Sequence, residues 1–505
     1  MHIRPSLDEL QTMVATHGER PYPIVCELLA DMETPVSAYL KIARSPYSFL
    51  LESVEGGERI GRYSFIGAEP RAIIRMQGEY SAIEIGGRQH EWKRRHGLDA
   101  LASLAGGFPA LPGGLLYPGL RLPRFTGGAV GYLSYETARS FERLPAPDGD
   151  AYGMPDGIWM VVDTLLAFDH LRHTIVVISN VMPGEELLAT RYRRAVERIE
   201  RLVEQLHAPL PGEVAPSLPL NAPQAAGSAD AVASNMTREQ YMAAVERAIE
   251  YIRAGDIFQV VLSQRFSRRT QAEPFALYRA LRVVNPSPYM YYLAMPEGHL
   301  IGASPEMLVR VENGLVETHP IAGTRRRGRD EVDERRMAAE LLGDEKERAE
   351  HLMLVDLGRN DIGRVARAGS VQVPRFMDVE RYSHVMHLVS HVTGELREDL
   401  TALDALRACF PAGTVSGAPK LRAMEIIAEL EPDQRGPYAG CVGYLGFDGN
   451  LDTAITIRTI ALRNGVAYVQ AGAGIVADSH PRLEYLETQN KARALLAAVD
   501  LAEGL

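Results

Sequence analysis

Cysteine is scarce in this chain, and basic residues are outnumbered by acidic ones, 54 to 65. Its 3 cysteines in 505 residues, Cys26, Cys409 and Cys441, are too few and too scattered for a disulfide framework or a cysteine-based zinc site. The net charge of −11 disfavours nucleic acid or an anionic membrane surface as a partner. No stretch approaches the ~18 apolar residues that a membrane span needs, and the first ten residues lack the apolar segment of a signal peptide. We therefore expect a cytoplasmic protein that binds no nucleic acid and no membrane.

A long stretch rich in Pro, Ala and Ser divides the chain into two unequal portions. Residues 1–206 form an N-terminal portion, in which short β-type runs at 49–53, 63–67 and 157–162 precede a charged helical pattern at 185–206. Residues 207–235 lack aromatic residues and periodicity, and they predict a linker or a surface loop. Residues 236–505 form the larger C-terminal portion. With 46% hydrophobic residues, the chain can bury a large core.

The C-terminal portion begins with a helix followed by a strand. Thr237 and Gln240 have the spacing of a capping box, and Gly255 is placed to end the helix. The apolar run 257–262 predicts a buried strand. Strand and helix patterns then alternate without a regular βαβ period. We therefore expect the α+β class, with an intertwined two-part sandwich of antiparallel sheets flanked by helices rather than a doubly wound parallel sheet.

One strand-like pattern occurs twice, far apart in the sequence. The segment 128–135, Gly-Ala-Val-Gly-Tyr-Leu-Ser-Tyr, is matched by 440–447, Gly-Cys-Val-Gly-Tyr-Leu-Gly-Phe. Glycine lets such strands run close to another backbone. The repeat predicts a core in which the two portions intertwine; coincidence between two glycine-rich strands is the alternative.

Two Glu-x-x-Glu pairs lie in helix-like segments, Glu347 with Glu350 and Glu484 with Glu487. Residues three apart share a helix face, so each pair can present two carboxylates to one cavity. Four converging carboxylates would repel one another, which makes a hard divalent cation such as Mg²⁺ a natural occupant. Two solvated helix faces are the alternative.

Basic side chains near these pairs could bind the anionic groups of a small substrate. Arg458 lies in the apolar run 453–459, a predicted strand, where it suits bidentate capture of a carboxylate or a structural ion pair. His387 lies in the β-branched run 385–393, also a predicted strand, and it could be an acid or base or an ordinary core histidine. Further anion-binding capacity comes from Thr324 to Arg327, Lys420 and the backbone amides of Gly472, Ala473 and Gly474.

Two common nucleotide-binding patterns are missing. The segment 413–420 lacks the Gly-Lys-Ser/Thr ending of a P-loop, and Pro419 removes an amide donor from it. No Gly-x-Gly-x-x-Gly follows a strand in the context of a dinucleotide-binding fold. Both ATP and NAD are therefore disfavoured, and the inventory suits a small dianion bound through a metal.

Several long motifs occur in an order that resembles the chorismate-utilising enzyme family. They are Ile-Gly-Ala-Ser-Pro-Glu at 301–306, His-Pro-Ile-Ala-Gly-Thr at 319–324, the acidic segment 344–361, Ser-Gly-Ala-Pro-Lys at 416–420 and Ala-Gly-Ala-Gly-Ile-Val at 471–476. The resemblance is dense over residues 235–497, and Leu-Leu-Glu-Ser at 50–53 extends it into the N-terminal portion. It implies the family's sandwich fold and chorismate as substrate.

Two positions indicate the branch of that family. Relatives that add water carry a lysine where this chain has Gln259, and a neutral amide cannot activate water as a base. The aminodeoxychorismate branch has a lysine where this chain has Ala322, which cannot attack the ring. The resemblance thus implies amination of chorismate by ammonia and loss of pyruvate to give anthranilate, the first step of tryptophan biosynthesis.

The resemblance also implies roles for individual residues. Glu350 and Glu487 would be the principal Mg²⁺ ligands, with Glu347 and Glu484 beside them. The implied catalytic residues are Glu306 as the acid for departure of the 4-hydroxyl, His387 for the pyruvate-elimination stage, and Thr414. The implied substrate-binding residues are Gly323, Thr324, Tyr444, Arg458, Gly472, Ala473, Gly474 and Lys491.

Regulation and assembly follow from the same resemblance. The family binds L-tryptophan as a feedback inhibitor away from the catalytic cavity, and Ser53, Pro288, Tyr289 and Met290 hold the matching positions. None of the cysteines lies in the nucleophile turn of a glutaminase, so the resemblance implies a hetero-oligomer in which a separate glutamine amidotransferase subunit supplies ammonia. The alternatives are a synthase that stops at 2-amino-2-deoxyisochorismate, an aminodeoxychorismate synthase and a catalytically silent tryptophan-binding subunit.

Overall fold

The computed structural model describes residues 2–53, 61–89, 93–94, 97–106, 108, 122–147, 149–211, 232–381 and 385–504. Most of the predicted linker, 212–231, lies outside the described residues. The last residues of the predicted range include a short strand, Ala233–Ser234, which pairs with Phe266 and Ser267 at a sheet edge.

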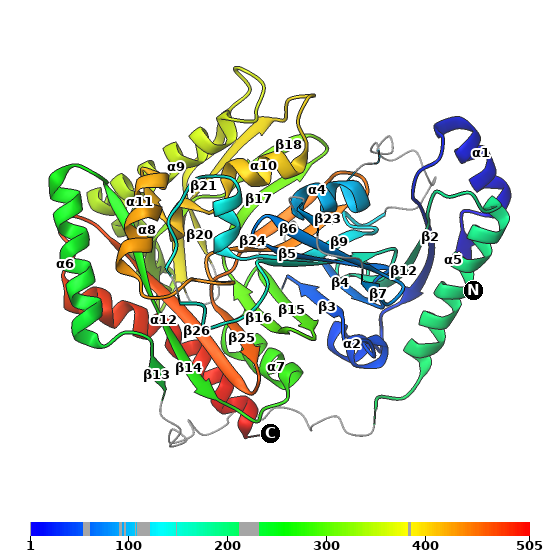
Figure 1. Ribbon diagram of the computed structural model, residues 1–505, viewed down its shortest axis with the longest axis horizontal. Coiled ribbons are helices and arrows are strands. Elements are labelled where there is room, and N and C mark those ends of the chain that lie inside the picture. Colours follow the sequence, from blue (N-terminus) through cyan, green and yellow to red (C-terminus); the bar gives the residue numbers. More distant parts are fainter. Residues whose placement is uncertain are drawn as a thin grey trace.

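Two sheets of 13 strands each form the body of the molecule, and all the strand pairings of the described chain are antiparallel (Figure 1). The first sheet has the spatial order β1 (Ile3–Arg4), β2 (Tyr22–Leu29), β12 (Thr174–Val181), β11 (Thr164–Asp169), β4 (Tyr63–Ala68), β3 (Ser48–Glu52), β15 (Tyr289–Met295), β16 (Gly298–Ser304), β25 (Thr459–Arg463), β26 (Val466–Ile475), β14 (Gln259–Arg269) and β13 (Ala233–Ser234), with β22 (Gly417–Ala418) also on β14.

The second sheet has the spatial order β19 (Ile321–Arg326), β21 (Val385–Glu395), β18 (Leu315–Thr318), β17 (Met307–Glu312), β24 (Leu451–Ile455), β23 (Cys441–Gly446), β9 (Gly128–Leu133), β10 (Gly157–Val162), β5 (Ala72–Gln77), β6 (Tyr80–Ile85) and β7 (Arg88–Gln89), with β20 (Gln372–Arg381) on β21 and β8 (Lys93–Arg94) on β6. The helices are α1 (Leu7–His17), α2 (Pro35–Ile42), α4 (Gly97–Leu101), α5 (Leu188–His207), α6 (Arg238–Ala254), α7 (Pro274–Val284), α8 (Glu331–Gly343), α9 (Glu345–Gly363), α10 (Ala402–Cys409), α11 (Lys420–Leu430) and α12 (Pro481–Glu503), with the short turns η1 (Ala102–Gly106), η2 (Tyr135–Ser140) and η3 (Gly413–Val415).

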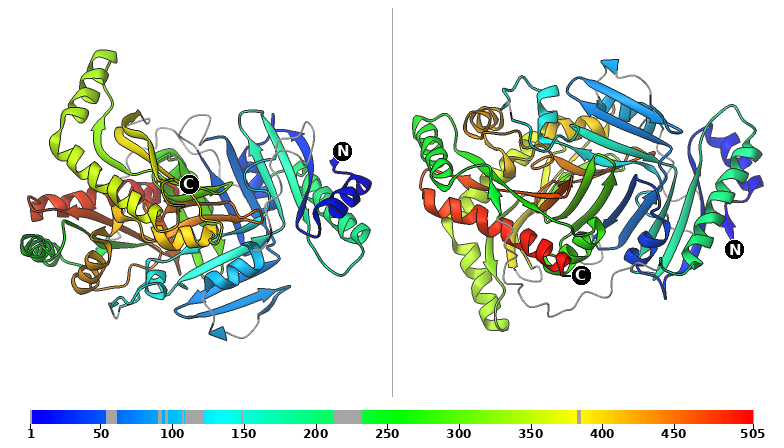
Figure 2. Two further views of the ribbon diagram at one scale, coloured as in Figure 1. Left: turned by 90° about the horizontal axis from the view of Figure 1, so that it is seen from above. Right: turned by 60° about the horizontal axis from the view of Figure 1, so that its bottom comes forward.

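The apolar cores show how these elements are layered. One core contains mainly strand side chains of both sheets, so the sheets pack face to face. A second core joins the first sheet to α2, α5, α7 and α12, and a third joins the second sheet to α9, α10 and α11. The fold is therefore an α+β sandwich of antiparallel sheets with helices outside it, as the sequence predicts. Helix α8 stands out from the body (Figure 2).

The two portions of the chain share both sheets. Strand β9 of the N-terminal portion pairs with β23 of the C-terminal portion, with Gly131 opposite Gly443. A Cβ at Gly128 would lie 2.0 Å from the carbonyl oxygen of Leu445 on β23, and a Cβ at Gly440 would lie 2.0 Å from that of Leu133 on β9, so the close approach of the two strands requires glycine there. Strand β3 likewise pairs with β15. The predicted intertwining is confirmed, and the repeated pattern marks two strands that are neighbours.

Most of the predicted elements form, with shifted ends. Helix α6 begins after Thr237 with the predicted capping box and ends at Gly255, which has a left-handed φ of 86°. Helix α5 begins at Leu188 rather than at residue 185, and β14 begins two residues after the predicted start of its strand. The prediction of one strand over 453–459 is wrong. That segment spans β24 and β25, which belong to different sheets, and Arg458 between them has a φ of +51°.

Candidate active site

A cavity of about 460 Å³ brings the four predicted glutamates together. Glu347 and Glu350 enter it from α9, and Glu484 and Glu487 enter it from α12. The cavity is also lined by β26 and by the turn at η3. Each helix contributes two carboxylates one turn apart, as the spacing of the Glu-x-x-Glu pairs predicts.

Two of these carboxyl groups, Glu350 and Glu484, have a raised pKa. Burial raises the pKa of Glu350 first, and the negative charges of Glu347 and Glu487 raise it further. Burial also raises the pKa of Glu484, with a contribution from Glu487. Two of the four have cationic partners: Arg325 donates to Glu347 at 3.1 Å, and Lys491 lies 2.7 Å from Glu487. The cavity thus concentrates negative charge that a bound cation would stabilise.

The donor set fits a hydrated magnesium ion. Among the described residues, no three His, Cys, Asp or Glu side chains are close enough to hold a metal ion by themselves. Carboxylates nevertheless line the cavity from two helices, and Mg²⁺ usually keeps several waters and takes one or two carboxylates together with an anionic ligand. The residues therefore suit Mg²⁺ bound partly through water.

Glu306 lies in the same cavity in a form suited to donate a proton. Burial raises its pKa to about 8, although Thr414 and Lys491 partly oppose this. The carboxyl is therefore protonated at pH 7. The Thr414 hydroxyl is buried in the same wall and makes no hydrogen bond of ordinary geometry with a described residue, so it remains available to a ligand.

Arg458 supplies a positive charge to the cavity. Burial lowers the pKa of its guanidinium, and the Tyr438 hydroxyl and Glu487 oppose that shift. Its guanidinium forms no ion pair within the described part of the chain. The structural ion pair that the sequence left open is therefore not seen among the described residues, and a half-buried guanidinium that lines the cavity favours a bound carboxylate.

The glycine-rich end of strand β26 and Lys491 complete this side of the cavity. Gly472 and Gly474 line it, and Lys491 donates to the carbonyl of Gly472 at 2.9 Å. Ala473 instead packs in the apolar core beneath β26, because successive residues of a strand point to opposite faces. The side chain of Ala473 therefore does not face the cavity.

His387 lies directly behind the wall of the cavity. Its Nδ1 donates to the carbonyl of Gly323, which lines the cavity, at 2.8 Å. Since a carbonyl only accepts, the proton is on Nδ1 and Nε2 is left basic. Burial lowers the pKa of His387, and the charge of Arg458 lowers it further, which keeps the ring neutral. Thr324 pairs with His387 through the backbone; His384 lies outside the described residues.

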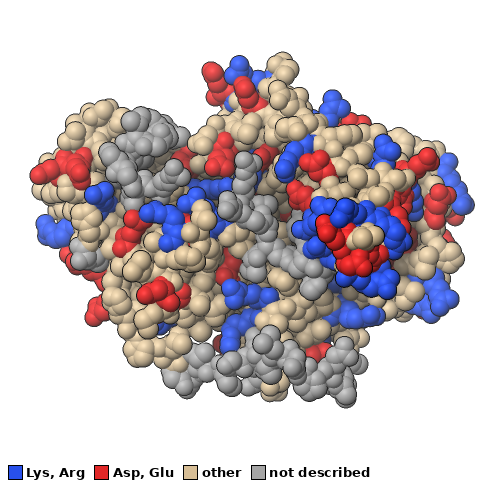
Figure 3. All heavy atoms as spheres, turned by 180° about the vertical axis from the view of Figure 1, so that it is seen from behind, with Lys and Arg blue, Asp and Glu red and all other residues tan. Residues whose placement is uncertain are grey.

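The other predicted anion-binding groups are engaged elsewhere. Lys420 donates to Asp361 at 2.8 Å, away from the cavity. Arg326 and Arg327 pair with acids at the start of α8. Figure 3 shows Lys and Arg interspersed with Asp and Glu over the back of the molecule, with no wide surface of one sign there. Arg326 and Arg327 therefore stabilise the start of α8.

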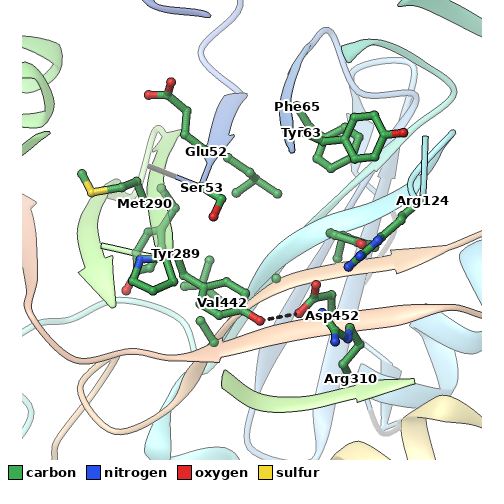
Figure 4. A pocket seen from close by; sticks show the side chains of 16 residues that line it. Glu52, Ser53, Tyr63, Phe65, Arg124, Tyr289, Met290, Arg310, Val442 and Asp452 are labelled. Atoms are coloured by element: carbon green, nitrogen blue, oxygen red, sulfur yellow. Dashed lines mark hydrogen bonds between the residues drawn. The ribbon is translucent and has the colours of Figure 1, made fainter. Parts of the chain in front are cut away.

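Tyr444 is not in the catalytic cavity. It lines a second pocket, together with the four residues predicted to bind tryptophan: Ser53, Pro288, Tyr289 and Met290 (Figure 4). The prediction that Tyr444 binds the substrate is therefore not supported by its position. Strand β23 lies beside β24, and Tyr444 packs between the sheets, where its ring lies 4.6 Å from that of Phe125.

The second pocket is apolar with a small polar group on one side. The Tyr289 hydroxyl donates to Asp452 at 3.2 Å, and Arg310 and Arg124 lie in the same wall (Figure 4). Burial raises the pKa of Asp452, while the two arginines lower it. Such a pocket suits a ligand with an aromatic body and charged polar groups.

Tyr438 and Ser479 are among the residues that line the catalytic cavity and were not singled out from the sequence. Tyr438 follows a Gly-Pro turn before β23, and the hydroxyl oxygen of Ser479 accepts a hydrogen bond from the backbone amide of Val476 at 3.0 Å. Neither belongs to a repeated or charged pattern. The only signal in the sequence for Ser479 is its place shortly after the glycine-rich segment 471–476.

Comparison with known proteins agrees with this architecture. Residues 46–497 match the chorismate binding enzyme family. The chain is 50% identical to anthranilate synthase component 1 of Acetivibrio thermocellus over 499 residues, 99% of each chain, and 50% identical to that of Pseudomonas aeruginosa over 497 residues, 97% of this chain and 98% of the relative.

Two solved structures have the same fold. Anthranilate synthase component I from Streptococcus pneumoniae superposes with a TM-score of 0.75 at 38% identity, over 93% of this chain and 99% of that chain. The menaquinone-specific isochorismate synthase of Escherichia coli superposes with a TM-score of 0.69 at 19% identity, over 98% of each chain, which shows a shared fold only. By its sequence and its fold, the chain belongs to the chorismate binding enzyme family.

Proposed function

We propose that this chain is the large subunit of an anthranilate synthase. The reaction joins chorismate and ammonia and yields anthranilate, pyruvate and water. The observation that carries the proposal is a single cavity that combines four glutamates, a protonated Glu306 and the half-buried Arg458. The identity of 50% with component 1 enzymes over nearly the full length supports it.

The cavity offers complementary groups for each part of chorismate. Glu350 and Glu487, with Glu347 and Glu484, would hold Mg²⁺, which supplies Lewis-acid polarisation at the ring carboxylate. Arg458 would bind a substrate carboxylate, and the backbone of Gly472 and Gly474 would approach the ligand closely.

Proton transfers fall to two residues, one a proton donor and the other a proton acceptor. Glu306, protonated at neutral pH, would give its proton to the departing 4-hydroxyl, which leaves as water. Ammonia adds at the ring carbon next to the one that bears the carboxylate, and then loses a proton. The neutral His387, with Nε2 unprotonated, would then take the ring proton as the C–O bond to the enolpyruvyl group breaks and pyruvate leaves.

Two side chains favour ammonia as the nucleophile. Gln259 lines the cavity and hydrogen-bonds to Glu350, so an amide stands where a lysine base would activate water. Ala322 is buried on β19 and presents no amine that could attack the ring. Both arguments point away from the water-adding and aminodeoxychorismate branches.

We propose that ammonia comes from a separate glutamine amidotransferase subunit, in a hetero-oligomer. A narrow cavity behind the catalytic one supports a side route for a small neutral molecule. It shares Glu306, Leu354 and Thr414 with the catalytic cavity, and Leu357 and Asp361 with a groove at the surface. Leu354, Leu357 and Asp361 lie on one face of α9, three and four residues apart.

We also propose that the second pocket binds L-tryptophan as a feedback inhibitor. Its apolar floor of Met290, Phe65 and Val442 suits an indole ring, and Asp452 with Arg310 and Arg124 suits the charged amino-acid end. Ser53 lies at its rim, at the end of β3 (Figure 4). The pocket is distinct from the catalytic cavity, as inhibition by a product of the pathway requires.

A cytoplasmic location stays a prediction. The helices of the described residues are all too short or too polar to cross a membrane.

The product of the reaction tests the proposal. Incubation with chorismate, Mg²⁺ and an ammonium salt should give anthranilate and pyruvate in equal amounts, identified by mass spectrometry. A product that retains the enolpyruvyl group would identify an aminodeoxyisochorismate synthase instead, and binding of tryptophan without any turnover would identify a silent regulatory subunit.

A further inference from the structure

One tyrosine spans the wall between the two cavities. Tyr291, on β15, lines the second pocket with its ring. Its hydroxyl lies 2.5 Å from Oγ1 of Thr459, the first residue of β25. Thr459 in turn donates to the carbonyl of Ile457 at 2.8 Å. Ile457 and the next residue, Arg458, line the catalytic cavity.

The direction of this chain of hydrogen bonds is fixed. Thr459 has one hydroxyl hydrogen, and the carbonyl of Ile457 can only accept it. The Tyr291 hydroxyl must therefore donate to Oγ1 of Thr459. Both residues are buried, with 2% and 9% of their surfaces exposed, so no solvent competes for these bonds.

The turn that these bonds hold is conformationally costly. Arg458 has a φ of +51°, a left-handed conformation that a side chain with a Cβ rarely adopts. Such a residue persists only where its surroundings enforce the conformation. Two contacts do so here. The hydroxyl of Thr459 holds the carbonyl before Arg458, and the amide of Ala303 donates to the carbonyl of Arg458 at 3.0 Å.

The tyrosine ring fits this place because of a glycine on the adjacent strand. Tyr291 lies opposite Gly302 in the β15–β16 pair. A Cβ at Gly302 would lie 2.1 Å from the ring and 2.4 Å from the hydroxyl oxygen of Tyr291. The missing side chain at residue 302 thus leaves the space for the ring, which lines the second pocket and reaches Thr459 beside the turn at Arg458.

We propose that Tyr291 is a positioning residue whose hydroxyl, acting through Thr459, holds Arg458 in place for the substrate and transmits the occupancy of the second pocket to the catalytic cavity. This inference rests on the proposed function of the two cavities and adds the route between them. A ligand in the second pocket that shifts the Tyr291 ring changes the support of the left-handed turn, and with it the binding of the substrate carboxylate.

Three variants test the hydrogen-bonded chain. Tyr291→Phe and Thr459→Val each remove one link, and Thr459→Ser keeps the hydroxyl. Tyr292→Phe is the matched control. Tyr292 is on the same strand, but its hydroxyl lies 3.1 Å from Nδ1 of His299 and does not contact Thr459. We expect Tyr291→Phe and Thr459→Val to raise the KM for chorismate about tenfold, the loss of one buried hydrogen bond, with a smaller change in kcat. Thr459→Ser and Tyr292→Phe should stay near the wild type.

Two further measurements separate this route from general destabilisation. The double variant Tyr291→Phe, Thr459→Val should be no worse than either single variant, because both break one chain. Calorimetric binding of tryptophan, with and without chorismate, should show mutual weakening in the wild type and little of it in Tyr291→Phe, with tryptophan still bound. Additive effects in the double variant, or unchanged coupling in Tyr291→Phe, would overturn the proposal. These outcomes are read in a wild-type enzyme that makes anthranilate, so they bear on this inference alone. A wild-type enzyme that makes no anthranilate would instead overturn the proposed function.

Discussion

The ammonium group of Lys491 lies 2.7 Å from a carboxylate oxygen of Glu487, four residues earlier on α12. The same ammonium donates to the carbonyl of Gly472 in the wall of the catalytic cavity. Lys491 thus neutralises one of the four glutamates that would hold the cation. Binding of Mg²⁺ and chorismate would free this lysine for the substrate, which links the two ligands in one cavity.

Loss of a carboxylate should weaken magnesium rather than the fold. We expect Glu350→Gln and Glu487→Gln each to raise the Mg²⁺ concentration needed for half-maximal activity at least ~10-fold, because each removes a hard anionic oxygen. The exposed Glu345→Gln, also on α9, is the control. A magnesium titration of activity measures this. Equal magnesium dependence in all three variants would show that the glutamate pairs are not the metal site.

The raised pKa of Glu306 predicts the pH profile. Its acid form is present below a pKa of about 8 and disappears as the pH rises through that value. We expect kcat to fall above about pH 8 for this reason. Glu306→Gln should lower kcat at least ~100-fold, the usual worth of a positioned acid, with little change in chorismate binding. An alkaline limb that is the same in a Glu306→Asp variant and in the wild type would contradict the assignment.

The narrow cavity behind Glu306 should matter for ammonia only. Leu357→Trp would fill it, while Leu352→Trp places the same ring on the exposed face of α9, where Leu352 is 47% exposed. We expect Leu357→Trp to raise the KM for ammonium and to leave the KM for chorismate unchanged. Steady-state kinetics at varied ammonium concentration measures this. An unchanged ammonium KM would show that ammonia enters by the mouth of the main cavity.

Tryptophan inhibition should depend on the rim of the second pocket. Replacing Ser53 with a bulky residue, as in Ser53→Phe, reduces the space beside Met290 and Tyr289. We expect a higher inhibition constant for tryptophan and largely unchanged turnover. Inhibition curves of the variant and the wild type decide this. An inhibition constant equal to that of the wild type would place the inhibitor elsewhere.

A buried carboxyl far from the cavity predicts how stability depends on pH. Burial raises the pKa of Glu136 to about 7; one oxygen accepts the Arg435 amide at 2.8 Å, and the other has no partner among the described residues. The folded state therefore binds a proton that the unfolded state has released, and stability falls as the pH rises from about 5 to above 7.

We expect the loss of stability across that range to be on the order of 3 kcal/mol in the wild type and nearly absent in Glu136→Gln. Thermal unfolding at pH 5 and pH 8 measures the difference. The control Glu142→Gln, two turns away and more exposed, should keep the wild-type dependence. An unchanged pH dependence in Glu136→Gln would show that another group is responsible.

The sequence predicted that the two glutamate pairs line one cavity and that the two portions of the chain intertwine, because each depends on local spacing or on side-chain chemistry. Glu-x-x-Glu on a helix places two carboxylates on one face wherever the helix packs. The repeated Gly-x-x-Gly-Tyr pattern works similarly, since only glycine allows the close approach of β9 and β23.

Tertiary arrangement explains what the sequence could not provide. The apolar pattern of 453–459 predicts one continuous strand that contains Arg458. In the structure Arg458 lies at a left-handed turn, where the chain crosses from one sheet to the other. Tyr444 was assigned to the substrate by motif position, but the pleat of β23 directs it to the layer between the sheets. The Tyr291–Thr459 contact joins residues 168 positions apart, which no local pattern encodes.

The most direct test of the account measures anthranilate fluorescence with chorismate and an ammonium salt, first with Mg²⁺ and then with a chelator in excess. We predict anthranilate formation that stops when the metal is removed and returns when Mg²⁺ is restored, with the double variant Glu350→Gln, Glu487→Gln inactive under both conditions. Anthranilate formation that survives chelation, or a double variant as active as the wild type, would contradict the proposed site.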